Sequence, residues 1–459
     1  MKISFNWLKN YLDFDLTPER TSEILTDTGL EIEGMHKFEE VTGGLDGVVV
    51  GEVLSCEPHP DADRLKVTQV SLGNETVQIV CGAPNIGKEQ KVLVATVGTN
   101  LYPNDGDTFK IKKAKIRGVE SSGMICAEDE LGIGNSHEGI LILPNEVPAG
   151  TKASAYYELY EDYQLEIGLT PNRCDAMGHI GVARDIKAFL NFHQNQNLVL
   201  KLPEANISSF ETKNQEHISI KIEDSQLCPR YIGALMDKVK IQQSPKWLQN
   251  RLKSIGLDPI NNVVDVTNFI MYEYGTPMHA FDRKHLKDEV VIKKAEKGTP
   301  FITLDGIERT LNGEELMITS NGKNLCIAGV YGGLDSGVSE STTSIFLESA
   351  IFNATSVRKT SKAHGLQTDA SFRFERGVDP TFTSDAMNRA IALIQEISGG
   401  ELTMKPVAID ELNVTEKKIS FSLKFLNDRL GTSLKLDEVI SILENLDFTC
   451  KIDSNKNIQ

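Results

Sequence analysis

The sequence has 459 residues, more than one hydrophobic core supports, and this length predicts roughly three or four domains. Hydrophobic residues make up 40% and charged residues 25%, which is typical of folded, water-soluble protein and excludes collagen-like or wholly disordered chains. The formal net charge of −17 argues against a nucleic-acid partner unless a local basic patch supplies the cations that phosphates require.

Membrane and metal signals are weak in this sequence. No apolar run approaches the roughly 20 residues that a membrane span needs. Lys9, Asp13 and Asp15 interrupt the start, where an export signal would need an apolar segment, so we expect a cytoplasmic protein. The seven cysteines are widely spaced and include no C-x-x-C pair, so neither a disulfide framework nor a zinc site is predicted.

The expected elements begin with a small α/β unit over residues 1–39. Its helix follows Thr17, a capping residue, and Pro18, which suits the first helical position, and it ends before Gly29. Residues 40–151 change to short Val-, Ile- and Thr-rich runs separated by turn clusters, a spacing typical of a small all-β barrel. Residues 152–195 resume helical and strand patterns, and we expect them to pack back on the N-terminal unit as one discontinuous domain.

A polar stretch over 193–197 and 203–215 predicts a linker before a larger α+β domain at 216–400. There, Ser244-Pro245 begins a helix that ends at Gly256, and another helix over Ser384–Ser398 ends at Gly399. Residues 401–459 carry two amphipathic helices with little to pack against, so we expect an incomplete helical domain that continues beyond this chain. The predicted fold class is multidomain α+β.

Three nucleotide or synthetase motifs are nearly present, and each lacks an essential part. Gly82–Lys88 has P-loop spacing, but Glu89 replaces the hydroxyl residue that binds magnesium. Gly178–Gly181 begins like a HIGH signature without its second histidine. Phe372–Glu375 has the form of an ATP-binding arginine motif without its glycine-rich partner. We therefore predict no adenylation site in this chain.

One basic cluster stands out inside the all-β insert: Lys110, Lys112, Lys113, Lys115 and Arg117. In a strand, these cations would project from both faces and could line an electrostatic groove for an RNA backbone. They could equally protect an edge strand from aggregation, because acidic residues outnumber basic ones across the insert.

An ordered series of motifs resembles known tRNA-handling modules. His59–Leu65, Val80–Asn85, Ile116–Cys126 and Glu130–Gly132 look like a tRNA-binding OB-fold module. Together with Met1–Ser4, Pro171–Asp175 and later motifs (Asn262–Asn268, Pro277–Asp282, Gly329–Gly333 and Thr368–Pro380), they resemble the β subunit of bacterial phenylalanyl-tRNA synthetases. The resemblance covers essentially the whole chain and matches the N-terminal part of that subunit.

The resemblance implies a β chain that binds tRNA(Phe) and proofreads. In that family the α subunit holds ATP, Mg²⁺ and the adenylation chemistry, and the expected assembly is an α2β2 heterotetramer. No metal ligand is expected in this chain, and neither DNA nor a membrane is an expected partner. Such a piece should not aminoacylate tRNA alone.

The resemblance also assigns a proofreading pocket. Its glutamate matches Glu348, a lone acid in an apolar run, which by residues alone could instead pair with an arginine. His279 matches a pocket histidine that could equally be a satisfied core residue. Thr267 and Asn268 match positions that orient water or ribose, or else they cap a turn before Phe269. The remaining assigned positions form the pocket wall or allow close backbone approach: Thr368, Ala370, Gly332 and Gly333.

Two main functions and a weaker third remain open on the sequence. No Ser-His-Asp set is evident, so hydrolysis of a mischarged tyrosyl ester would use a positioned water without an acyl-enzyme. The alternative is a structural tRNA-binding subunit whose pocket is inactive. A small-molecule enzyme is a weaker third interpretation, because no complete cofactor motif is present.

Overall fold

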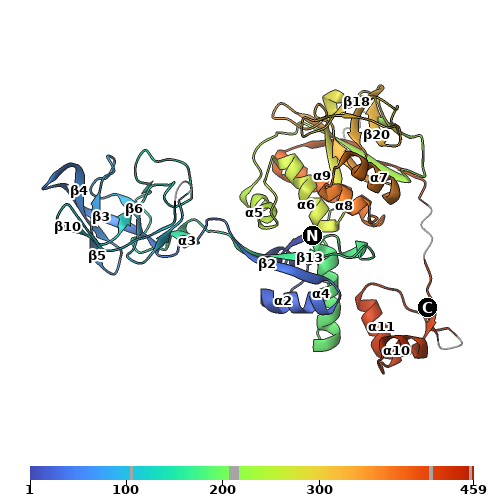
Figure 1. Ribbon diagram of the computed structural model, residues 1–459, viewed down its shortest axis with the longest axis horizontal. Helices are drawn as coiled ribbons and strands as arrows, with labels where there is room; N and C mark the ends of the chain where they lie inside the picture. The colour runs from blue at the N-terminus through green and yellow to red at the C-terminus, as the bar shows by residue number, and fades with distance from the viewer. Residues whose placement is uncertain (104–106, 206–216, 413–416, 454–456) are drawn as a thin grey trace. The chain divides into compact units, whose positions relative to one another are not determined.

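The structure, a computed structural model, describes residues 1–103, 107–205, 217–412, 417–453 and 457–459. The chain is a mixed α+β protein with two compact units, Lys37–Asp162 and Met1–His36 together with Tyr163–Gln459 (Figure 1). Most of the expected linker, 206–215, lies outside the described residues.

The N-terminal elements form a three-stranded sheet with helices beside it. The elements are β1 (Lys2–Ser4), α1 (Phe5–Leu8), α2 (Pro18–Asp27), β2 (Glu31–Glu39), β13 (Glu161–Gly168) and α4 (His179–Gln194), with strand order β1-β13-β2. The predicted start of α2 is confirmed, because the Thr17 side chain accepts a hydrogen bond from the backbone N–H of Arg20. Gly29 follows with a φ of 93°, which glycine adopts without strain.

The unit Lys37–Asp162 is built on an antiparallel sheet of order β11-β6-β3-β4-β5, with β12 also paired to β6. The strands of this sheet are β3 (Val48–His59), β4 (Ala62–Ser71), β5 (Thr76–Cys81), β6 (Lys91–Ala95), β11 (Met124–Ile125) and β12 (Ile142–Leu143). Two short strand pairs accompany it: β7 (Asn100–Leu101) pairs with β8 (Phe109–Lys110), and β9 (Ala114–Ile116) pairs with β10 (Val119–Ser121). The unit also contains helix α3 (Ala153–Tyr156). The prediction of a β-rich region is therefore confirmed.

Two sheets organise the larger C-terminal region. The first has order β16-β23-β15-β24: β16 (Met278–Asp282), β23 (Ser344–Ile351), β15 (Arg230–Asp237) and β24 (Glu401–Asp410). The second sheet has order β14-β17-β20-β21-β22: β14 (Ser219–Ile222), β17 (Glu289–Lys294), β20 (Leu316–Ser320), β21 (Lys323–Ile327) and β22 (Tyr331–Gly332). A separate hairpin consists of β18 (Pro300–Ile302) and β19 (Glu308–Thr310). Because β24 pairs with β15, the first sheet continues past residue 400, where we expected the domain to end.

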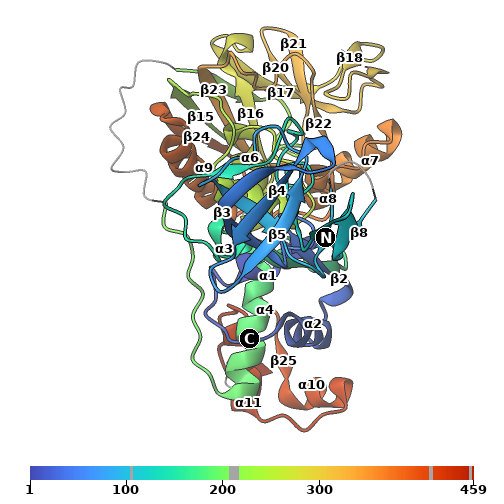
Figure 2. The same ribbon diagram turned by 90° about the vertical axis from the view of Figure 1, so that its left-hand side faces the viewer.

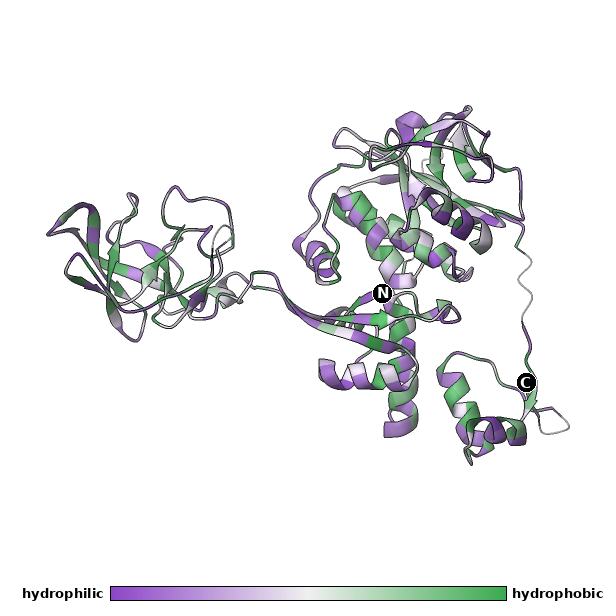
Figure 3. Ribbon diagram, viewed as in Figure 1, coloured by the Kyte–Doolittle hydropathy of each residue, from purple (hydrophilic) through white to green (hydrophobic). Residues whose placement is uncertain are grey.

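The first sheet is covered on both faces. Alternate residues of β23, such as Ile345 and Leu347, join the core formed with helices α6 (Asn262–Tyr274) and α9 (Phe382–Ser398). Their neighbours Phe346 and Ala350 join a second core with strands β17, β20 and β21. Figure 2 shows the sheet between these two layers, and in Figure 3 α6 is largely hydrophobic. A polar residue on the Phe346 face of β23 therefore lies between the two sheets.

The predicted helix ends are confirmed in this region. Helix α5 (Lys246–Ser254) precedes Gly256, and α9 ends at Gly399, both glycines having positive φ. Two further helices, α7 (Ala354–His364) and α8 (Asp369–Phe374), follow β23.

The last described elements are α10 (Leu423–Leu430), α11 (Leu436–Asn445) and the short pair β25 (Phe421–Ser422) with β26 (Asn457–Ile458). Helix α11 has a partner in α4, since Asn191 Nδ2 donates to Asn445 Oδ1 at 2.7 Å. Just past α11, Asp447 accepts hydrogen bonds from Arg184 Nε at 2.6 Å and Lys187 Nζ at 3.0 Å. Helix α10 buries no residue, as expected, whereas α11 buries Val439 and contacts α4, so the expectation that both helices have little to pack against is wrong for α11. Among the described helices, none is long and apolar enough to cross a membrane.

Candidate functional site

Glu348 lies on the central strand β23, on the face that meets the second sheet. In the register of the sheet it is opposite Gly233 of β15 on one side and His279 of β16 on the other. Its side chain is buried, with only 5% of the residue exposed. Burying a charged carboxylate without a cation is costly, so this position needs an explanation beyond packing.

The described partner of Glu348 is a phenol. Tyr231 Oη donates a hydrogen bond to Glu348 Oε2 at 2.7 Å, and both side chains are buried. Burial raises the pKa of Glu348 to about 8, although the hydrogen bond from Tyr231 acts in the opposite direction. Within the described residues no ion pair involves Glu348, so the alternative of an arginine partner is wrong.

His279 presents an unpaired polar atom beside this carboxyl. Its Nε2 atom is enclosed yet has no hydrogen-bond partner among the described residues, and its ring packs edge-on against Phe281 at a centroid distance of 4.4 Å. Burial lowers the pKa of His279 to about 4, so the imidazole is neutral near pH 7. The described contacts give no support to the alternative of a satisfied core histidine, because no described residue pairs with Nε2.

Gly332 and Gly333 differ in what surrounds them. A Cβ at Gly332 would lie 2.9 Å from Leu304 Cδ1 and 3.2 Å from His279 Cε1, so this glycine is next to the imidazole. A Cβ at Gly333 would lie 2.6 Å from the backbone oxygen of Leu325. The absence of a side chain at Gly332 therefore leaves space beside His279, whereas at Gly333 it accommodates the chain's own backbone.

Thr368 and Ala370 lie at the start of helix α8, next to the loop that leads into β22. Thr368 Oγ1 donates to the backbone oxygen of Val330 at 2.9 Å and accepts from the N–H of Ser371 at 3.0 Å. Ala370 packs against both hydrophobic cores. The Val330 contact ties the start of α8 to the strand that carries Gly332.

Thr267 and Asn268 are on helix α6. They lie within the helix, so the alternative that they cap a turn before Phe269 is wrong. The Thr267 hydroxyl donates to the backbone oxygen of Val264 at 2.7 Å. No contact described in the structure joins either side chain to Glu348 or His279, so these two positions are not brought into the cluster.

Sequence reasoning missed Tyr231 and Cys326. Tyr231 follows Arg230 in an apolar strand, and a lone phenol in such a run was the available signal. Cys326 on β21 is opposite Gly332, and burial raises the pKa of its thiol well above the ordinary value. The thiol therefore stays protonated and is a poor nucleophile.

The basic cluster does not form one strand. Lys110 ends β8, buried Ile111 follows, and the chain restarts as β9 before a two-residue turn at Arg117 and Gly118, both with positive φ. The expectation of alternating faces along a single strand is therefore wrong. All five cations are exposed. Lys110 and Lys112 line a cavity of about 710 Å³ whose wall also includes Pro84, Met124 and Ile140.

Two of the three near-miss motifs make structural contacts, and the third forms a loop. His179 stacks on Trp7, with ring centroids 3.8 Å apart, and accepts a hydrogen bond from the N–H of Ser4. Arg373 is fully buried and donates to the backbone oxygens of Met177 and Asp369. Gly82–Lys88 is a loop between β5 and β6.

Across the described ranges, no group of three or more His, Cys, Asp or Glu residues could hold a metal ion.

Comparison with known families places these features in two domains. Residues 48–152 match the family described as "Putative tRNA binding domain", and residues 227–399 match the B3/4 domain. Glu348, His279 and Tyr231 lie within the second match, and the basic cluster lies within the first. The chain thus has the composition of a protein that joins a tRNA-binding module to a B3/4 domain.

Its relatives are phenylalanine–tRNA ligase β subunits. The subunit of Bacteroides fragilis (strain ATCC 25285) is 48% identical over 450 residues, 97% of this chain and 54% of the relative. That of Porphyromonas gingivalis is 49% identical over 451 residues, again 97% and 54%, and that of Bacillus subtilis (strain 168) is 43% identical over 458 residues, 98% and 55%. The resemblance seen in the sequence is confirmed: over nearly all its length this chain is a relative of phenylalanine–tRNA ligase β subunits. It spans about half the length of those relatives.

Among solved structures, an N-terminal fragment of the phenylalanyl-tRNA synthetase β subunit from Pyrococcus horikoshii is similar, with 17% identity and a TM-score of 0.31. The match covers 65% of this chain and 80% of that one.

Proposed function

We propose that this chain is the part of a phenylalanine–tRNA ligase β subunit that binds tRNA(Phe) and hydrolyses mischarged tyrosyl-tRNA(Phe). The observation that carries the proposal is the environment of Glu348: a buried carboxyl with no ion-pair partner among the described residues, directly opposite the unpaired imidazole of His279.

The need for such a pocket follows from substrate chemistry. Tyrosine differs from phenylalanine by one hydroxyl, and an apolar pocket rejects an added hydroxyl by only about 10². A second pocket that hydrogen-bonds the hydroxyl discriminates by as much as about 10⁴ to 10⁵, because phenylalanine leaves the pocket's polar group unpaired. Glu348 is the group we assign to that task, since in either protonation state it can pair with a phenol.

The proposed hydrolysis uses a positioned water. His279 is neutral near pH 7 and offers one ring nitrogen to a water or a ribose hydroxyl. We assign it positioning and not general-base duty, and we assign Thr267 and Asn268 to orient the terminal ribose. Thr368, Ala370, Gly332 and Gly333 form the wall. The protonated thiol of Cys326 fits a mechanism without an acyl-enzyme.

The RNA contact is proposed for the unit Lys37–Asp162. Exposed Lys110, Lys112, Lys113, Lys115 and Arg117 supply cations there despite the acidic balance of the chain. We propose that this unit is an OB-fold barrel over 40–151, set between the halves of an N-terminal domain (1–39 and 152–195), with an editing domain over 216–400 and an incomplete helical domain over 401–459.

The complete ligase would contain more than this chain. We propose an α subunit as partner in an α2β2 assembly located in the cytoplasm, with ATP and Mg²⁺ serving aminoacylation there. The described side chains do not fit a metal site of their own, so no step in this chain is assigned to either group.

A non-catalytic role as a structural tRNA-binding subunit is the second candidate. It is favoured by the hydrogen bond from Tyr231, because Glu348 already has one partner in the absence of substrate.

The deciding experiment supplies tyrosyl-tRNA(Phe) to this chain, and in parallel to the assembled ligase, and measures release of tyrosine. We expect release to be faster than with the Glu348→Ala variant in at least the assembled ligase. Salt-sensitive tRNA binding without any Glu348-dependent release in either form would select the structural role.

A further inference from the structure

Two buried tyrosine–glutamate pairs occur among the described residues, and they differ in charge compensation. Tyr11 Oη donates to Glu273 Oε1 at 2.6 Å, and Arg389 Nε donates to the other oxygen of Glu273 at 3.4 Å. Tyr231 Oη donates to Glu348 Oε2 at 2.7 Å with no cation. The first pair is a neutralised structural contact, whereas the second leaves a carboxyl oxygen available.

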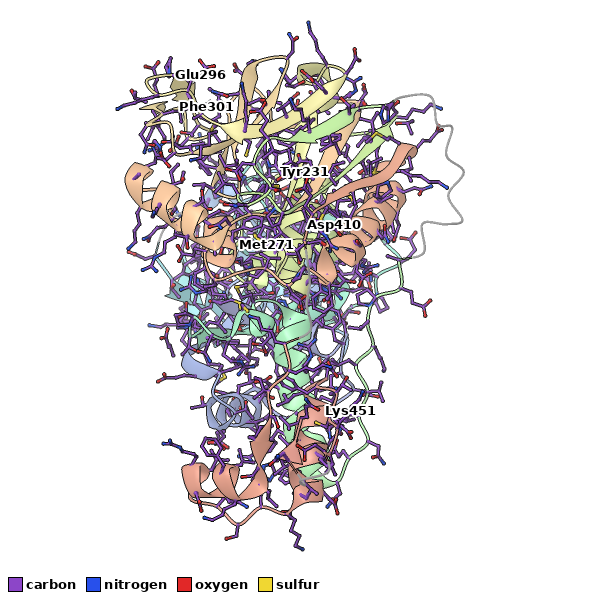
Figure 4. The ribbon with its side chains drawn as sticks, turned by 90° about the vertical axis from the view of Figure 1, so that its right-hand side faces the viewer. Tyr231, Met271, Glu296, Phe301, Asp410 and Lys451 are labelled. Carbon is purple, nitrogen blue, oxygen red and sulfur yellow. The ribbon has the colours of Figure 1, made fainter. Side chains whose placement is uncertain are left out.

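The sheet register explains how Tyr231 reaches Glu348. On β15, Tyr231 is opposite Ala350 and Gly233 is opposite Glu348. Tyr231 and Glu348 are therefore diagonal neighbours on the same face, and the two residues directly opposite them are small. A Cβ at Gly233 would lie 2.3 Å from Phe346 Cζ, so a larger residue does not fit there. Figure 4 shows Tyr231 between the layer that carries Phe301 and the helix that carries Met271.

One oxygen of Glu348 is thus occupied and the other is not. Oε2 accepts from Tyr231, while Oε1 accepts no hydrogen bond within the described chain. The unpaired His279 Nε2 atom is fully enclosed, whereas the unpaired Oε1 atom of Glu348 is not. The phenol of Tyr231 therefore occupies one oxygen of the carboxyl and leaves the other without a described partner.

We propose that Tyr231 is a positioning residue for specificity: it fixes the Glu348 carboxyl so that Oε1 alone receives the hydroxyl of a tyrosyl substrate. This inference rests on the proposed editing function. An ordered acceptor binds a phenol without first losing rotamer freedom, which is the advantage of preorganisation.

The same hydrogen bond also influences the protonation of Glu348. Burial raises the pKa of Glu348 to about 8, and Tyr231 opposes that rise. The titratable groups around Glu348 are Tyr231 and His279 on the flanking strands, Cys228, and Cys326 on the second sheet, and none is positively charged near pH 7. Tyrosyl binding should therefore strengthen as the pH rises through the pKa of Glu348, because a phenol donates a stronger hydrogen bond to the anion.

The test measures binding of two probes to this chain: tyrosyl- and phenylalanyl-adenosine with an amide in place of the ester. Tyr231→Phe removes one hydroxyl and keeps the ring. Tyr11→Phe is the matched control, because it removes the other buried tyrosine–glutamate hydrogen bond. We expect Tyr231→Phe to reduce the preference for the tyrosyl probe at least about tenfold. It should also move the pH midpoint of tyrosyl binding upward, whereas Tyr11→Phe changes neither.

A second variant protects the test against misfolding. Replacing Tyr231 by 3-fluorotyrosine keeps its shape and makes the phenol a stronger donor, so the midpoint should move downward. One outcome separates the two proposals. In it, Glu348→Gln removes the preference for the tyrosyl probe while both changes at position 231 leave that preference and the pH midpoint of tyrosyl binding unchanged. In that case the role assigned to Tyr231 is wrong and the proposed editing function stands. If the unaltered chain does not prefer the tyrosyl probe at all, both proposals fall.

Discussion

Glu348 and His279 are directly opposite each other on antiparallel strands, and burial moves their pKa values in opposite directions. The pKa of Glu348 rises to about 8 and that of His279 falls to about 4. Both groups are therefore mostly uncharged near pH 7. The site keeps hydrogen-bonding atoms in a buried position without holding a permanent buried ion, which suits recognition of a neutral phenol.

The first prediction concerns stability against pH. The pKa of Glu348 is raised from 4.5 to about 8 on folding, so the folded state retains a proton that the unfolded chain releases in this window. The contribution of Glu348 to the free energy of unfolding should thus fall by roughly 1.4 kcal/mol per pH unit between about pH 4.5 and pH 8. Above pH 8 this contribution should no longer change.

The Glu348→Gln variant isolates this effect. Burial also raises the pKa of Asp185, Asp265 and Glu273, so the wild-type curve alone is a sum. The free energy of unfolding is measured for wild type and variant by denaturant titration from pH 5 to 8.5. The variant should become increasingly more stable than the wild type as the pH rises. A difference that does not change with pH would mean that Glu348 titrates normally.

The second prediction compares two adjacent glycines. Gly332→Ala would press on the Leu304 side chain, which is half-exposed and can move, so we expect little loss of stability but weaker tyrosyl-ester hydrolysis as space beside His279 is filled. Gly333→Ala would place Cβ 2.6 Å from a backbone oxygen, and should cost several times more in thermal stability. Equal melting temperatures for the two variants would contradict this interpretation.

The third prediction concerns the unpaired imidazole. Replacing His279 by Leu removes an enclosed polar atom that has no partner among the described residues. The free energy of unfolding should therefore increase by about 1 kcal/mol or more. Tyrosyl-ester hydrolysis should be lost at the same time, because the positioned water loses a partner. Thermal unfolding and deacylation are the two measurements, and a destabilised variant would indicate that His279 has a packing role only.

The fourth prediction concerns RNA. Changing Lys110, Lys112, Lys113 and Lys115 to Gln, with Arg117→Asn because Asn tolerates the positive φ at that turn, should weaken tRNA binding and flatten its salt dependence. The slope of log affinity against log salt should fall by about 0.7 to 0.9 for each phosphate that is no longer neutralised. Neutralising exposed lysines elsewhere, such as Lys297 and Lys359, is the control and should change the slope little.

Local signals predicted much of the fold, whereas pairing between distant strands did not show in the sequence. The caps of α2 and the glycines that end α5 and α9 act within a few residues, so their patterns are visible. Tyr231 and Glu348 are 117 residues apart, and only the register of β15 and β23 joins them. Without the family resemblance, Glu348 would have been interpreted as an ordinary ion-pair partner.

The basic cluster shows the opposite error. Its residues were identified from composition, yet their geometry was misjudged, because buried Ile111 and the turn at Arg117 and Gly118 divide the run. A single short segment with alternating lysines does not indicate where the chain turns. The side-chain directions therefore had to come from the structure.

The most direct test of the proposed recognition is a crystal structure of this chain with the non-hydrolysable tyrosyl-adenosine amide. We predict that the phenol oxygen lies within hydrogen-bond distance of Glu348 Oε1, with Tyr231 still donating to Oε2 and the adenosine near His279. A tyrosyl group bound elsewhere, or a Glu348 that remains sealed from the ligand, would contradict it.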